Sequence, residues 1–276
     1  MGASAPPADF ALDLVLAAAP QVNARQGLQA ARQAVALARS PHDRALAGAW
    51  VCTHLMRLGH HAELLDEASR VLPQLSPPDL AVQRRELLRG ITLCGSEIGA
   101  FDVALDAAQQ LAHDSRTADN TEATLTASYS LAVCLERMGD SSQAQRLLRE
   151  ARAGHEPAEP SRPLLVAANA VCAMAIGMVH RLRGASTEAD LQAALQGGRE
   201  HGELALRLLA HVNDPVYEIA VPGNLGEVLL LQGHLDEARS LLQRSLDLAL
   251  TRGLHGYAWR VQTSMADWML AVGQPL

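Results

Sequence analysis

The run from Asn224 to Leu250, NLGEVLLLQGHLDEARSLLQRSLDLAL, decides the fold of this chain. Leu225 and Leu229 precede Gly233 at the spacing that puts apolar side chains on one face of a helix. Glycine tolerates the left-handed backbone conformation that often closes a helix, so Gly233 marks a helix end. Ala238 and Leu242 follow at helical spacing. The run therefore predicts two helices joined by a tight turn.

The same pattern recurs along the chain at intervals of about 40 residues. Glycines that end apolar helical stretches are Gly59, Gly99, Gly139, Gly184, Gly233 and Gly273. Five residues after the first five come Leu64, Ala104, Ala144, Ala189 and Ala238, and four residues further come Ala68, Ala108, Leu148, Ala193 and Leu242. Small inward residues let two helix backbones approach closely. We expect Ala144 and Ala238 to be almost inaccessible to solvent.

The fold class predicted from this repeat is all-α. We expect one right-handed α-solenoid of antiparallel helix pairs over residues 1–276, with about 13 helices. The predicted repeats span approximately 5–40, 45–80, 85–120, 125–160, 170–215 and 219–255, with a half repeat at 257–273. Asp140, Ser186 and Asp236 are the expected helix caps. Aromatic residues make up only 3% of the chain, so strand formers are scarce.

These residues resemble the tetratricopeptide repeat, whose pattern is Leu-Gly-x-x-Tyr, then Gly, then Ala, then a large apolar residue and Ala. The run quoted above is the best copy, and Leu131 to Ala151 and Ile176 to Ala193 are two others. The period is near 40 rather than the usual value of about 34, and leucine mostly replaces the tyrosine. The resemblance is to the long-period bacterial type found before diguanylate cyclase domains and in LuxR- and MalT-like regulators.

The composition excludes several activities. All 23 basic residues are arginine, which removes the lysine that a P-loop or a Schiff-base enzyme requires. A net charge of −7 without an arginine-rich tract argues against nucleic-acid binding. No G-x-S-x-G or H-E-x-x-H motif is present. We therefore expect no enzyme activity and no cofactor.

Cysteine and histidine are expected to be structural. Cys52, Cys94, Cys134 and Cys172 are spread too widely for a zinc site, and we expect reduced, buried thiols. His54, His60 and His61 are expected to be solvated histidines near a turn rather than metal ligands. The sequence shows no targeting segment and no apolar run of membrane-spanning length, which favours a cytoplasmic protein without a membrane partner.

The first helix of each repeat lines the inner surface of such a solenoid, and its exposed positions are candidate binding residues. The repeat register gives Trp50, Thr53, Arg57, Arg89, Glu97, Tyr129, Glu136, Arg137, Arg181, Asn224, Glu227 and Arg260, with Leu93, Val133, Met174, Met178 and Asp267 on the same helices. Arg89, Tyr129 and Asn224 are the strongest candidates, because they place hydrogen-bond donors and an aromatic ring on one stripe of the first helices. Some tetratricopeptide domains clasp chaperone carboxylates with lysine and asparagine, but Ala49 and Thr53 stand at those positions here.

Two classes of function remain. The first is a scaffold or sensor in bacterial signalling that binds a protein or peptide in a concave groove. The alternative is an N-terminal regulatory region of a larger enzyme or transcription regulator, such as a diguanylate cyclase, whose effector domain follows Leu276. The last helix carries Trp259, Val261, Met265, Trp268, Met269 and Leu270 on more than one side. We therefore expect a missing second helix, a partner or a homodimer through this helix, unless the helix is itself a cap.

Overall fold

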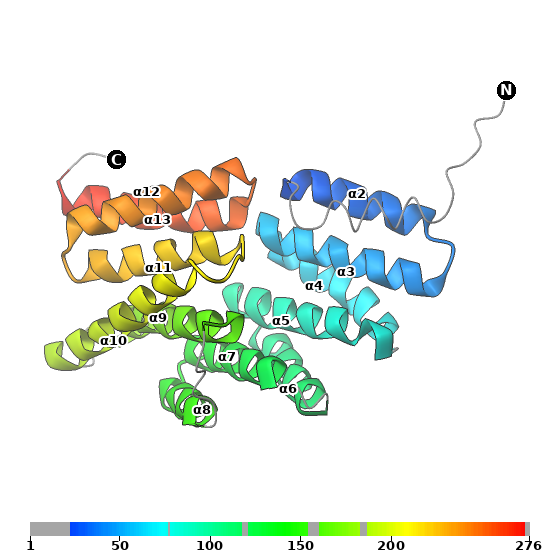
Figure 1. Ribbon diagram of the computed structural model, residues 1–276, viewed down its shortest axis with the longest axis horizontal. Coiled ribbons are helices and arrows are strands. Elements are labelled where there is room, and N and C mark those ends of the chain that lie inside the picture. Colours follow the sequence, from blue (N-terminus) through cyan, green and yellow to red (C-terminus); the bar gives the residue numbers. More distant parts are fainter. Residues whose placement is uncertain (1–22, 77, 118–120, 154–159, 183–186, 274–276) are drawn as a thin grey trace. The chain divides into compact units, whose positions relative to one another are not determined.

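A computed structural model describes residues 23–76, 78–117, 121–153, 160–182 and 187–273. These residues form twelve α-helices and two short 3-10 turns, and they contain no strand (Figure 1). The prediction of an all-α, tetratricopeptide-like helical repeat is confirmed. The first expected helix of repeat 5–40 lies outside the described residues. The first described helix therefore corresponds to the second helix of that repeat, and the predicted total of about 13 helices is tested only from there on.

The helices fall in two compact units. The first unit runs to Leu111 and includes residues 252–256; the second comprises Ala112–Thr251 and the residues from Tyr257 on. That the two units make one continuous solenoid stays a prediction. In chain order the helices are α2 (Ala24–Leu37), α3 (Pro41–Leu58), α4 (His61–Val71), α5 (Ala81–Glu97), α6 (Phe101–Thr117), α7 (Thr121–Arg137), α8 (Ser141–Ala153), α9 (Arg162–Leu182), α10 (Glu188–Leu208), α11 (Tyr217–Leu231), α12 (Leu235–Thr251) and α13 (His255–Ala271). The 3-10 turns are Leu72–Gln74 and Pro78–Leu80.

The helix-closing role of the repeated glycines is confirmed where the structure describes them. Gly59, Gly99, Gly139, Gly233 and Gly273 all have positive φ, between 72° and 93°. After α7 the amide of Gly139 donates to Glu136 O at 3.0 Å, and the amide of Asp140 donates to Leu135 O at 2.9 Å. These two bonds satisfy carbonyl groups at the helix end. Gly184 and the expected cap Ser186 lie outside the described residues.

The close approach of paired helices is also confirmed at most positions. Ala104, Ala144 and Ala238 are all 0% exposed. Asp140 caps α8 as expected, because its Oδ1 accepts from the amide of Gln143 at 3.0 Å.

The register predicted for α10 is wrong. Ala189 and Ala193 are exposed rather than inward. The helix begins at a capping box in which Thr187 and Asp190 bond each other's backbone amides, so its inward face starts further along the chain. Gly198 and Gly202 provide the close contact instead: a Cβ on Gly198 would lie 2.5 Å from Ala175 Cβ.

Helix α9 is the central helix of the second unit and packs against α7, α10 and α11. The expectation that no apolar run reaches membrane-spanning length is wrong by length and composition, because the α9 stretch Leu164–Arg181 is long and apolar enough to cross a membrane, with a mean hydropathy of 1.6. Of that stretch, 56% is buried inside the fold. The core helix of a soluble protein meets the same two criteria of length and hydropathy.

Candidate binding site

A recess between α11 and α13 contains three of the predicted binding residues. Asn224, Glu227 and Arg260 line it together with Ile219, Ala220, Gly223, Tyr257, Val261 and Ser264. All of these residues belong to the second unit, where α11 lies between α9 and α10 on one side and α12 and α13 on the other (Figure 1). The recess holds about 260 Å³ of empty space, part of it open solvent.

Asn224 is the centre of a hydrogen-bond chain that joins three helices. Its Nδ2 donates to Oδ1 of Asn169 on α9 at 2.9 Å. Its Oδ1 accepts from the guanidinium of Arg260 on α13. The expectation that Asn224 is exposed is wrong, because the residue is only 3% exposed. Its carboxamide nevertheless reaches the recess and holds Arg260 there.

Glu227 lies one turn along α11 and has its own set of partners. Its Oε1 is 3.5 Å from Nε2 of His180 on α9, and its Oε2 accepts from Ser264 Oγ on α13 at 3.1 Å. Burial acts to raise the pKa of Glu227, but the hydrogen bonds from His180 and Ser264 and the charge of Arg260 bring the pKa below its usual value. The carboxylate is therefore ionised at neutral pH.

A second polar contact links α7 to α9. Glu136, which is buried contrary to expectation, forms an ion pair with Arg181. Gly177 makes room for it, since a Cβ there would lie 2.8 Å from Glu136 Oε2. The neighbouring Arg137 is half-buried. Glu136 and Arg181 therefore link α7 to α9 by an ion pair inside the second unit.

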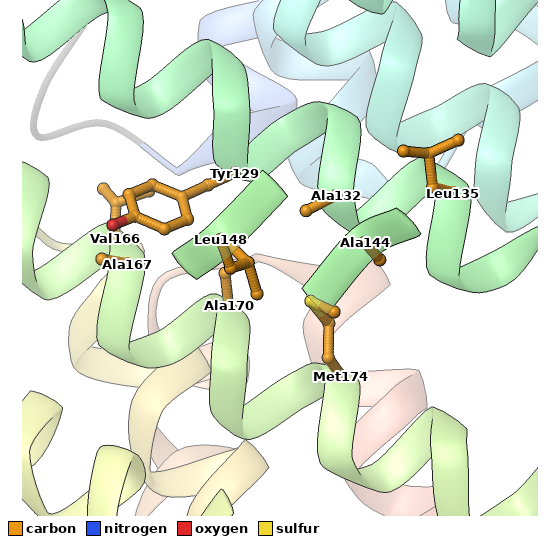
Figure 2. Close-up of a cluster of buried hydrophobic side chains, with 9 residues drawn as sticks. All are labelled: Tyr129, Ala132, Leu135, Ala144, Leu148, Val166, Ala167, Ala170 and Met174. Carbon is orange, nitrogen blue, oxygen red and sulfur yellow. The ribbon is translucent and has the colours of Figure 1, made fainter. Parts of the chain in front are cut away.

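Tyr129 is not on an exposed stripe, and its assignment as an exposed residue is wrong. It is 3% exposed and belongs to a hydrophobic cluster formed by α7, α8 and α9. Figure 2 shows its ring beside Val166 and Ala167 of α9. Met174, which the register also placed outward, is buried in the same cluster. Both side chains point into the core because α9 is packed against α7 on this side.

The predicted residues of the first unit form no comparable site among the described residues. Trp50 packs half-buried against Ala34 and Ala47, and Thr53 donates to Ala49 O at 3.0 Å within its own helix. Arg89 donates to Glu86 of the same helix at 2.9 and 3.1 Å. Arg57 is half-buried and Glu97 is exposed.

The cysteine side chains belong to the hydrophobic core. The four cysteines are free and buried, as predicted, and burial raises the pKa of Cys52, Cys94 and Cys172 to about 12. Such thiols are poor nucleophiles at neutral pH. The described residues hold no group of three or more His, Cys, Asp and Glu that could bind a metal ion.

Sequence reasoning missed three polar residues of the site, namely Asn169, His180 and Ser264. Asn169 stands alone among apolar residues in the stretch from Leu164 to Ile176. A lone carboxamide in an apolar helix needs a hydrogen-bond partner when it is buried, and that was the available signal. His180 and Ser264 carry no comparable signal in one sequence.

Comparisons with known proteins support the fold. No family model matches the sequence, and no curated protein sequence matches it. Among solved structures, the chain is similar to the crystal structure of a Rap protein complexed with Competence and Sporulation Factor. The match has 13% sequence identity and a TM-score of 0.55, and it covers 97% of this chain and 76% of that chain. At this identity the similarity concerns the arrangement of helices.

Proposed function

We propose that this chain is a peptide- or protein-binding helical-repeat module that acts without catalysis, in bacterial signalling and in the cytoplasm. The proposed binding surface is formed by the first helices of three consecutive pairs, α9, α11 and α13. Its polar side chains are Asn169, His180, Asn224, Glu227, Arg260 and Ser264. The observation that carries the proposal is the convergence of Asn224, Glu227 and Arg260 on one recess. These three residues come from two repeats, and all three occupy positions that the repeat register predicts for binding.

The chemistry of the recess suits a polypeptide ligand. A peptide backbone presents N–H donors and C=O acceptors at every residue. The recess offers amide and guanidinium donors beside a carboxylate and a hydroxyl, on helices that fix their positions. The small volume favours a segment lying along the surface, as helical-repeat arrays bind their partners. The Rap protein of similar fold was crystallised in a complex, which supports a binding role for the scaffold.

Affinity selection from a degenerate peptide library tests this function. The full chain is immobilised, and retained peptides are identified by mass spectrometry and resynthesised for calorimetry. We expect a defined set of sequences to be retained by the wild type and to bind Asn224→Ala at least about tenfold more weakly, because this change also frees Arg260 and Asn169 from their partner.

Arg244→Gln is the matched control. Arg244 is exposed on α12, outside the recess, and its replacement should leave peptide binding unchanged. Circular dichroism melting of each variant separates loss of binding from loss of folding. Equal retention of the same peptides by the wild type and Asn224→Ala would contradict the proposed site, and no enrichment by the wild type would contradict the function.

A further inference from the structure

Arg260 carries a positive charge that the described residues leave without an ion-pair partner. The guanidinium has five N–H donors, and its one hydrogen bond in the described part of the chain goes to the neutral Oδ1 of Asn224. No carboxylate of the described residues lies within 4.0 Å of it. The side chain is half-buried and lines the recess. A cation held in this way is oriented toward the recess by one bond while its other donors stay available.

Glu227 attracts Arg260 by charge, but no ion pair within 4.0 Å joins the two side chains. Glu227 is directed to other partners, with one oxygen near His180 and the other bonded to Ser264. Because both oxygens are engaged, Glu227 can remain in place when a second acidic group approaches Arg260. The other residues of the recess are apolar or neutral, so Arg260 is its one cation among the described residues.

We propose that Arg260 binds a carboxylate of the ligand, with Asn224 positioning the guanidinium. The planar fork of arginine matches the two oxygens of a carboxylate with two parallel hydrogen bonds. A phosphate dianion fits less well, since this recess has one cation and the negative Glu227 beside it. The carboxylate is either the C-terminus of a peptide or an Asp or Glu side chain. This inference rests on the proposed function for its ligand class, and it is tested separately below.

The first experiment compares peptide forms. Each retained peptide is synthesised with a free C-terminus, with an amidated C-terminus, and with Asp or Glu replaced by Asn or Gln. We expect one of the neutralised forms to bind the wild type at least about tenfold more weakly. Arg260→Gln should reduce this ratio to about one, Arg260→Lys should keep part of it, and Arg244→Gln should keep all of it. Equal binding of all forms by the wild type, or an unchanged ratio in Arg260→Gln, would overturn the inference while leaving peptide binding intact.

A second experiment needs no selected peptide. The Nε–H signal of Arg260 is identified in the NMR spectrum of the full chain by its absence from Arg260→Gln, and that of Arg244 by its absence from Arg244→Gln. N-acetylalanine should shift the Arg260 signal, whereas N-acetylalanine amide should not, and the Arg244 signal should stay in place. A shift with neither compound, or a larger shift with inorganic phosphate, would overturn the carboxylate assignment even where no peptide is retained.

Discussion

The imidazole of His54 lies almost entirely out of water on α3, with its ring against the backbone of Gly27 on α2. The residue is 2% exposed, and a Cβ on Gly27 would come within 2.1 Å of its Cε1. Its Nδ1 has no hydrogen-bond partner among the described residues. Burial, assisted by the charge of Arg57, lowers the pKa of His54 to about 4. The expectation of a solvated histidine is wrong here, because α2 covers this side of α3.

His54 should make the stability of the first unit depend on pH. The unfolded chain binds a proton at His54 below pH 6.5, whereas the folded chain binds it only near pH 4. Stability therefore falls as the pH drops from 6.5 toward 4, by roughly 3 kcal/mol from this residue, and levels off below. In urea unfolding measured at several pH values, His54→Leu should lose this part of the pH dependence. His113→Leu, which changes an exposed histidine, should keep it.

Also at the scale of residues, two alanines that the sequence pattern made equivalent should respond differently to the same substitution. Ala238 is 0% exposed, and its carbonyl oxygen lies near Gly226 of the paired helix. Ala238→Leu overpacks this contact and should lower the free energy of unfolding by roughly 1–3 kcal/mol. Ala189→Leu changes an exposed position and should shift it by less than about 0.5 kcal/mol. Urea denaturation of both variants measures the difference, and similar values would show that the observed register is wrong.

At the scale of elements, the helices themselves were predictable, whereas one of their registers was not. The glycine series gave the helix pairs because a left-handed residue at each helix end leaves a mark in the sequence. For α10, the prediction of inward residues five and nine positions after Gly184 is wrong. The helix begins only after the capping box at Thr187, so these positions fall in its exposed first turns. The pattern Thr187-x-x-Asp190 and the small residues Gly198, Gly202 and Ala205 were the signals for the true inward face.

The packing of α10 on α9 provides a test with adjacent residues. A Cβ on Gly198 would lie 2.5 Å from Ala175 Cβ, so Gly198→Ala forces the two helices apart and should lower the unfolding free energy by roughly 1–3 kcal/mol. A Cβ on Gly197 would meet nothing within 4 Å. Gly197→Ala should therefore raise the unfolding free energy by about 0.5–1 kcal/mol, through helix propensity alone. Thermal unfolding of the two variants checks both signs.

At the scale of the whole molecule, the sequence predicts which residues occupy equivalent repeat positions but not what covers them. Asn224, Glu227 and Arg260 were found from the register and do meet. Tyr129 and Glu136 were found by the same rule and are buried, because the neighbouring α9 covers them. The partners Asn169 and His180 lie about 45 to 55 residues away in sequence, so their contacts depend on helix packing that no local pattern encodes.

The outer side of α13 carries the last prediction, which concerns self-association. Val261 and Trp268 are buried, and the indole of Trp268 donates to Leu235 O at 2.8 Å. The side of α13 that carries these two residues is therefore packed within the second unit. Trp259 and Leu270 are 71% and 59% exposed, and their separation of three helical turns puts them on one face. We expect a homodimer through this face.

Light scattering over a concentration series should show a mass that rises toward twice that of the chain. Trp259→Glu should return the protein to a monomer, because a charge cannot be buried against apolar side chains without a partner. Glu200→Ala, at an exposed position on α10, should leave association unchanged. A constant monomer mass for the wild type at high concentration would contradict the homodimer and leave Trp259 as a single exposed surface residue of the kind that monomeric proteins tolerate.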